Sequence, residues 1–109
     1  MHKERLKVKT IIKRYMNELS KLGVEVQRVI LYGSYAKGSF RKDSDIDLVV
    51  VSDDFKGKNL RERLEILGIA AVRLMEPIEA YGVTPDEIES LEEVSFLKEA
   101  LSSGVMVRK

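Results

Sequence analysis

Apolar residues recur at helical spacing along the first part of the chain and form short continuous runs further on. The spacing predicts an amphipathic helix from Glu4 to about Lys21, with Gly23 as its C-terminal stop. The segment that ends in "VILY" is a run of β-branched and aliphatic residues too short for a helix, so it predicts a buried strand that ends at Gly33. The apolar positions of the helix are Val8, Ile11, Ile12, Tyr15, Met16, Leu19 and Leu22.

A second strand and a second helix follow in the middle of the chain. Ile46 to Ser52 predicts the strand, and "SDDFKGKN" supplies turn residues around Gly57. Apolar positions from Leu60 to about Met75 predict the helix. Three further apolar residues widen its stripe, so we expect the helix to be covered on more than one side. These three residues are Ile66, Ile69 and Val72.

The last third of the chain predicts a third strand, "PIEAYGVT", and then helical sequence. Thr84 is a suitable N-cap, Pro85 suits the first helical position, and Glu87 is placed to close a capping box. We expect the last helix to end at Gly104 and "VMVRK" to form a short edge strand. This order favours one α/β (or α+β) domain over residues 1–109, with helices packed on a small sheet.

Composition limits the partners more than it identifies them. The 109 residues are 44% hydrophobic and 34% charged, with a net charge of +1, so no global field favours DNA, RNA or anionic lipid. The lack of cysteine excludes disulfides and zinc–thiolate sites. No apolar run approaches the roughly 18 residues that span a bilayer, and the charged N-terminus lacks the core of a signal peptide. A cytoplasmic protein without a membrane partner is the expectation.

Two carboxylates stand at the start of the second strand. Asp45 and Asp47 are two residues apart, so in an extended backbone they leave the same face, with Cα atoms about 6.5 to 7 Å apart. Carboxylates so placed can share divalent cations. In two-metal sites the ions stabilise the attacking and the leaving oxygen of a phosphoryl displacement. Mg²⁺ suits this role because it combines a few carboxylates with waters and substrate phosphates.

The loop before these carboxylates has the features of a phosphate site. Gly33 follows a strand, where backbone N–H groups can approach an anion, and Ser34 offers a hydroxyl and a helix start. The loop also carries basic residues, which we interpret first as solvated: Lys37, Arg41 and Lys42. A P-loop is excluded because Ser39 and Phe40 stand where its lysine and Ser/Thr belong.

The joint pattern resembles a known family. Gly33-Ser34, ten residues, and then Asp45-Ile46-Asp47 match the G-S-x10-D-x-D signature, so the chain resembles the minimal nucleotidyltransferases of the DNA polymerase β-like superfamily. "SDIDL" and "EPIEAYGVTPDEI" extend the resemblance over almost the whole chain.

The resemblance implies a mixed β-sheet flanked by helices and an Mg²⁺-dependent transfer of a nucleoside monophosphate to a hydroxyl, with two ions expected. By position, Gly33 and Ser34 correspond to the nucleotide-binding pair, and Asp45 and Asp47 to catalytic metal ligands. Glu79 stands where the family usually has a third aspartate, and we expect it to act as a further metal ligand or as the base for the acceptor.

The resemblance also suggests substrates and partners. ATP is the expected donor, and the acceptor is expected to be a hydroxyl, such as a tyrosine of a partner HEPN toxin, which would make this chain an antitoxin. A small domain leaves a nucleotide exposed on one side, so a homodimer or a hetero-complex is expected to complete the pocket. The alternative is a module of another class, a catalytically weak antitoxin that retains nucleotide and metal affinity and acts by occluding a partner protein. A nucleic-acid polymerase would need a basic groove that the balanced charge does not provide.

Overall fold

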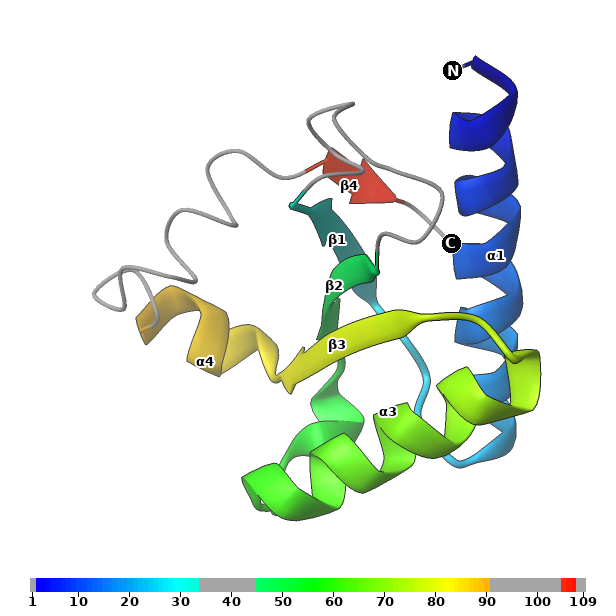
Figure 1. Cartoon of the computed structure of the whole chain (residues 1–109). Coiled ribbons are helices and arrows are strands. Elements are labelled where there is room, and N and C mark those ends of the chain that lie inside the picture. The colour runs from blue at the N-terminus through cyan, green and yellow to red at the C-terminus, as the bar shows by residue number, and fades with distance from the viewer. Residues whose placement is uncertain (1, 34–44, 91–104, 108–109) are drawn as a thin grey trace.

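The computed structural model describes residues 2–33, 45–90 and 105–107, and Figure 1 shows their arrangement. The predicted basic loop residues, Ser34 and the expected end of the last helix at Gly104 lie outside these ranges. In chain order the described elements are α1 (His2–Lys21), β1 (Arg28–Tyr32), β2 (Ile46–Val51), the 3-10 turn η1 (Asp53–Phe55), α3 (Leu60–Leu74), β3 (Ile78–Val83), α4 (Pro85–Ser90) and β4 (Val105–Val107).

The strands form one mixed sheet in the order β3-β2-β1-β4. β1 pairs antiparallel with β2 and with β4, whereas β2 and β3 run parallel. The parallel pair is possible because α3 forms the crossover between β2 and β3, as crossover helices do in βαβ units. The predicted fold class, a small mixed sheet flanked by helices, is confirmed.

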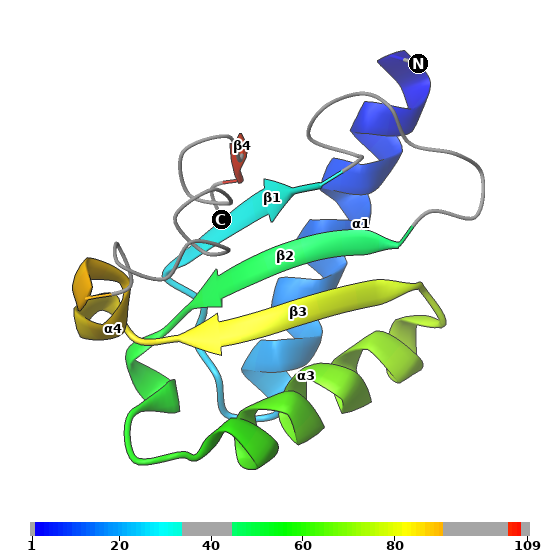
Figure 2. The ribbon, with the colours of Figure 1, turned by 60° about the vertical axis from the view of Figure 1, so that its left-hand side comes forward.

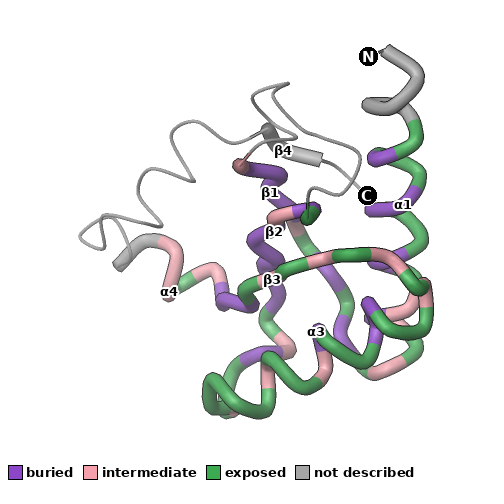
Figure 3. The backbone as a smooth tube through the Cα atoms, in the orientation of Figure 1, coloured by how far each residue is buried: buried purple, intermediate pink, exposed green. Residues whose placement is uncertain are grey.

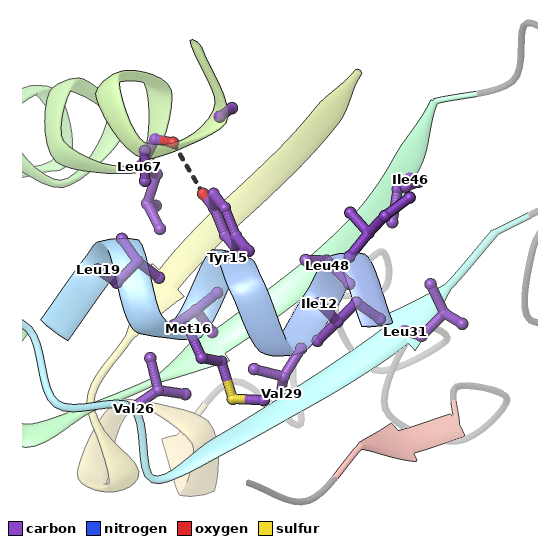
Figure 4. Packing of buried hydrophobic residues seen from close by; sticks show 14 of the residues in the cluster. Ile12, Tyr15, Met16, Leu19, Val26, Val29, Leu31, Ile46, Leu48 and Leu67 are labelled. Carbon is purple, nitrogen blue, oxygen red and sulfur yellow. Dashed lines mark hydrogen bonds between the residues drawn. The ribbon is translucent and has the colours of Figure 1, made fainter. Parts of the chain in front are cut away.

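One face of the sheet carries the main core, which α1 and α3 cover (Figure 2). The apolar stripe predicted for α1 is buried there, including Ile12, Tyr15 and Leu19 at 0% exposure. The Tyr15 hydroxyl donates a hydrogen bond of 2.8 Å to the Leu67 carbonyl of α3, so the two helices are joined inside the core (Figure 4). None of the helices in the described part of the chain is long and apolar enough to cross a membrane.

The opposite face of the sheet carries a second, smaller cluster. Alternate residues of the strands point there because side chains alternate along a strand, and Val49 and Val51 are almost fully buried. Ile88 of α4 packs against this cluster. Figure 3 shows how burial follows the inner strands and declines toward β3. The remaining members of the cluster are Ile30, Tyr32 and Val83.

The helix starts are fixed by side chains. Thr84 and Glu87 form the predicted capping box, in which the Thr84 N–H donates to the Glu87 carboxylate at 2.8 Å and the Glu87 N–H donates to the Thr84 hydroxyl at 3.2 Å. Asn59 and Glu62 form a second capping box, at the start of α3. Arg63 then joins the two helices through its ion pair with Glu87.

The outer side of α3 differs from its prediction. Ile69 is 42% exposed and Val72 is 74% exposed, so two of the three residues expected to be covered on a second side lie at the surface, whereas Ile66 packs against the main core. The reason is that α3 meets the sheet only through one side, where Leu67, Ala70 and Ala71 are buried. Buried positions are mostly apolar, but an apolar residue need not be buried, since folded proteins expose much apolar surface.

Candidate active site

Asp45 and Asp47 lie at the start of β2. Asp45 immediately precedes the strand and is exposed, whereas Asp47 is its second residue and is half-buried. The Ile46 N–H donates to the Pro77 carbonyl at 2.8 Å, which fixes this end of β2 against the start of β3. Ile46 and Leu48 belong to the core under α1 and α3. Asp47 therefore points to the opposite face of the sheet, as the alternation of a strand requires.

The register of the sheet places Asp47 between two functional groups. Its partner on β1 is Tyr32 and its partner on β3 is Glu79. Because neighbouring strands lie about 4.8 Å apart, side chains in register on one face are direct neighbours. The sheet thus brings the predicted carboxylates of β2 and β3 together, although Asp47 and Glu79 are far apart in the sequence.

Gly33 lies directly against the Asp47 carboxylate. Its φ of +75° is a left-handed conformation that side chains rarely adopt, and a Cβ atom there would lie 3.2 Å from Asp47 Cγ and closer still to one carboxylate oxygen. Glycine is therefore required twice at this position, by the backbone conformation and by the space. The turn after β1 and the carboxylate of β2 form one surface. Ser34, its predicted partner in nucleotide binding, lies outside the described residues.

The environment of Asp47 favours its protonated form. Burial, followed by the charges of Glu79 and Asp45, raises the pKa of Asp47. Burial is also the main cause that raises the pKa of Tyr32 to about 12, and the charges of Asp47 and Glu79 contribute. The site therefore concentrates negative charge and perturbed pKa values, which is a common feature of functional sites.

Glu79 borders two open grooves on the outer side of the sheet. It is exposed on β3, which is an edge strand of the sheet. One groove, of about 300 Å³, runs between β3 and Leu64 and Gly68 of α3. The other, of about 620 Å³, reaches from α3 past Glu79 to Asp45. A substrate can therefore approach the carboxylates from the side of β3.

The donor set fits Mg²⁺ when it is combined with a substrate. Among the described residues, no group of three or more acidic or histidine side chains is arranged to hold a metal ion. Mg²⁺, however, is usually held by one or two carboxylates together with waters and substrate phosphates. Asp45 and Asp47 supply such a pair. Burial, followed by the charges of Glu79 and Asp45, raises the pKa of Asp47, and a divalent cation would offset the repulsion among these carboxylates. Their role as metal ligands, and that of Glu79, remains a prediction.

Tyr81 is a site neighbour that the sequence reasoning did not single out. It stands two residues after Glu79 on β3, is 41% exposed, and its charge contributes to the raised pKa of Tyr32. The signal that could have found it is the period of two from Glu79, which puts both side chains on the face of Asp47. Tyr32, the register partner of Asp47 on β1, is buried in the second cluster.

The comparisons with known proteins agree on the family and the fold. A family model described as "Nucleotidyltransferase domain" matches residues 10–104. Two proteins of Methanocaldococcus jannaschii, each named "putative protein adenylyltransferase", are similar over shorter segments. One is 44% identical over 43 residues, which are 38% of this chain and 43% of that protein. The other is 36% identical over 62 residues, which are 56% of this chain and 61% of that protein. Each match thus spans less than two thirds of the relative.

Two solved structures share the fold. A "putative nucleotidyltransferase" from Sulfolobus solfataricus matches 95% of this chain and 82% of its own, with a TM-score of 0.64 and 18% identity. A toxin-antitoxin structure with AMP-PNP matches 75% of this chain and 60% of its own, with a TM-score of 0.55 and 21% identity. At such identities the likeness concerns the fold alone.

Proposed function

The chain belongs to the nucleotidyltransferase domain family, as the motif around Asp45 and Asp47 predicted, and we propose that it transfers AMP from ATP to a hydroxyl of a partner protein. One observation carries the proposal. The left-handed Gly33 lies on the carboxylate of Asp47, which is itself in register with Glu79. A triphosphate on this turn would therefore lie beside both carboxylates.

Each residue has a part in the proposed reaction. The absence of a side chain at Gly33 lets the turn lie against the Asp47 carboxylate, and backbone N–H groups of this turn would bind phosphate oxygens. Asp45 and Asp47 would hold Mg²⁺, which when bound neutralises the charge that develops on the transferred phosphoryl group. The acceptor oxygen bonds to the α-phosphorus, the bond from that phosphorus to the β-phosphate oxygen breaks, and pyrophosphate leaves. Glu79, the exposed carboxylate beside Asp47, would take the proton of the acceptor hydroxyl.

A protein acceptor is supported by the names of the Methanocaldococcus jannaschii relatives, which describe protein adenylyltransferases. The toxin-antitoxin structure with AMP-PNP shares the fold and is consistent with a toxin as the partner. We therefore keep the tyrosine of a HEPN toxin as the specific acceptor that the sequence resemblance predicts. The identity of the acceptor protein can be wrong while the transfer of AMP from ATP to a hydroxyl is right, so the two are tested separately.

The test is label transfer from α-labelled ATP in Mg²⁺ to a candidate HEPN toxin. The comparison is between the wild type, the double variant Asp45→Asn and Asp47→Asn, and Glu79→Gln. We expect transfer by the wild type, none by the double variant, and a low rate in Glu79→Gln with nucleotide binding retained. Neutralisation of the partner by wild type and double variant alike would instead favour a module that acts by occlusion.

A further inference from the structure

The outer edge of β3 pairs with no other strand among the described residues. β3 is the last strand on its side of the sheet, as Figure 2 shows. Two hydrogen bonds identify the edge of β3 that faces β2. The Ile46 N–H donates to the Pro77 carbonyl at 2.8 Å, and the Ser52 N–H donates to the Val83 carbonyl at 2.9 Å. Backbone groups alternate along a strand, so the odd-numbered residues 77–83 face β2 and the even-numbered residues face outward.

Both ends of this outer edge are occupied, but its centre is not. The Ile78 N–H donates to the Glu76 carbonyl at 2.9 Å, and the Gly82 carbonyl accepts from Arg63 at 3.2 Å. Between them, no residue that the structure describes bonds to the outward N–H and carbonyl of Ala80. Such an edge is a template for a further strand, which is one of the recurring ways in which proteins bind peptides.

The helix beside this edge supplies an apolar floor. Leu64, Gly68 and Val72 follow one another at intervals of four on α3, and they line the two grooves together with Ile78 of β3. Leu64 is 43% exposed and Val72 is 74% exposed. Apart from its chain neighbours and its own helix backbone, no atom of the described residues lies within 4 Å of a Cβ built on Gly68, so the floor is open at its centre. The apolar surface that was expected to be buried therefore borders the open edge.

The charge along the grooves has one sign. Among the described residues that line them, the charged ones are Asp45, Glu76 and Glu79, all acidic. A segment that enters here gains from basic side chains, whereas an acidic segment is repelled. The backbone, the apolar floor and the charge thus agree on one type of ligand.

We propose, on the basis of the function proposed above, that the acceptor protein docks by adding an extended, basic segment as a strand on the outer edge of β3. Its backbone pairs with Ala80. Alternate side chains enter the grooves over α3, and the others lie on the face of Glu79 and Tyr81, since side chains alternate along a strand. A hydroxyl on that face is delivered beside Glu79.

The spacing of the strands also selects the acceptor side chain. The added strand would lie one spacing from β3 and two spacings, about 9.6 Å, from the strand of Asp47. A tyrosine opposite Glu79 can reach across the first of these spacings toward the site, whereas a serine at the same position cannot. The docking mode therefore favours tyrosine over serine as the acceptor.

The test uses a synthetic peptide of alternating lysine and valine with one central tyrosine, and needs no nucleotide. Ala80→Pro removes the outward N–H without touching the bonds to β2, and proline is tolerated on an edge strand. Ala80→Val is the matched control because it adds bulk and keeps the N–H. We expect the peptide to bind the wild type and Ala80→Val. It should bind Ala80→Pro roughly tenfold more weakly, because one hydrogen bond is lost and the peptide carbonyl that would accept from the N–H of residue 80 is left unpaired.

A second ligand keeps the test independent of the folding of Ala80→Pro. The same peptide with every backbone nitrogen N-methylated has the same side chains but no backbone donors, so it should bind the wild type much more weakly in either strand orientation. Equal binding of both peptides, equal binding by both Ala80 variants, or no binding of the first peptide would overturn the docking mode. A wild-type dimer that Ala80→Pro makes monomeric would overturn it too, since a second copy would then occupy the edge.

Failure of the proposed function would look different. If the wild type binds the peptide through Ala80 but transfers no label from ATP to its tyrosine in Mg²⁺, the chemistry is wrong and the docking surface stands. If label transfer to the tyrosine peptide is unaffected by Ala80→Pro and by N-methylation, the chemistry stands and the docking mode is wrong.

Discussion

Replacement of Gly33 by alanine tests the closest contact of the site. The left-handed conformation, φ +75°, costs alanine about 1–2 kcal/mol. The new Cβ would also lie 3.2 Å from Asp47 Cγ and nearer still to a carboxylate oxygen, so Asp47 must move. Overpacking of this kind costs typically 1–3 kcal/mol. The free energy of unfolding should therefore fall by about 2–5 kcal/mol.

Gly57 provides the matched control. Its φ is +82°, but apart from its chain neighbours no atom of the described part of the chain lies within 4 Å of a Cβ built there, so Gly57→Ala carries the conformational cost alone. The expected loss is about 1–2 kcal/mol. In an Asp47→Ala background the clash is absent, and Gly33→Ala should cost no more than Gly57→Ala does. The double-mutant cycle isolates the contact between Gly33 and Asp47.

Urea unfolding followed by circular dichroism measures these losses. In thermal unfolding, each kcal/mol lost should lower Tm by about 4 °C in a domain of this size. Gly33→Ala should also weaken ATP binding, because Asp47 is displaced. Equal losses for Gly33→Ala and Gly57→Ala, independent of Asp47, would refute the close packing of the turn on the carboxylate.

Two further predictions concern the framework. A Cβ on Gly82 would lie 2.7 Å from the buried ring of Phe55, so Gly82→Ala should lower the free energy of unfolding by about 1–3 kcal/mol. Gly68 lies in open space on α3, so Gly68→Ala should raise it by up to about 1 kcal/mol. Urea unfolding measures both changes. The hydrogen bond from Arg63 is the main cause that lowers the pKa of Glu87 below its usual 4.5. The ionised Glu87 thus stabilises the fold above about pH 4.5, and this effect is lost as the pH falls through its folded-state pKa. The difference in free energy of unfolding between wild type and Glu87→Gln should therefore shrink in acid. An unchanged difference would contradict the ion pair.

Local signals in the sequence predicted those elements in which a residue's own chemistry decides the conformation. Thr84 and Glu87 form the capping box that "TPDE" predicted. Gly23 follows α1 with a φ of +90°, the left-handed conformation typical of a helix stop. The box formed by Asn59 and Glu62 was equally readable, since an N-cap residue followed three positions later by glutamate is its signature.

Long-range features could not be predicted in this way. The exposure of Ile69 and Val72 depends on which side of α3 meets the sheet, and their apolar character gives no information about that. The neighbourhood of Asp47 with Tyr32 and Glu79 arises from strand pairing between distant segments. Sequence spacing placed Asp45 and Asp47 on one strand end, but only the register of the sheet shows what stands on either side of Asp47.

The central claim is that Asp45, Asp47 and the turn at Gly33 hold a metal-bound nucleotide. The most direct measurement is an amide NMR spectrum of the protein with a non-hydrolysable ATP analogue, in which Mg²⁺ is replaced by paramagnetic Mn²⁺. The account predicts that the resonances of Gly33, Asp47 and Glu79 broaden first, while that of Gly57 stays sharp, and that Asp45→Asn with Asp47→Asn abolishes the effect. Broadening centred elsewhere, or equal broadening in the double variant, would contradict it.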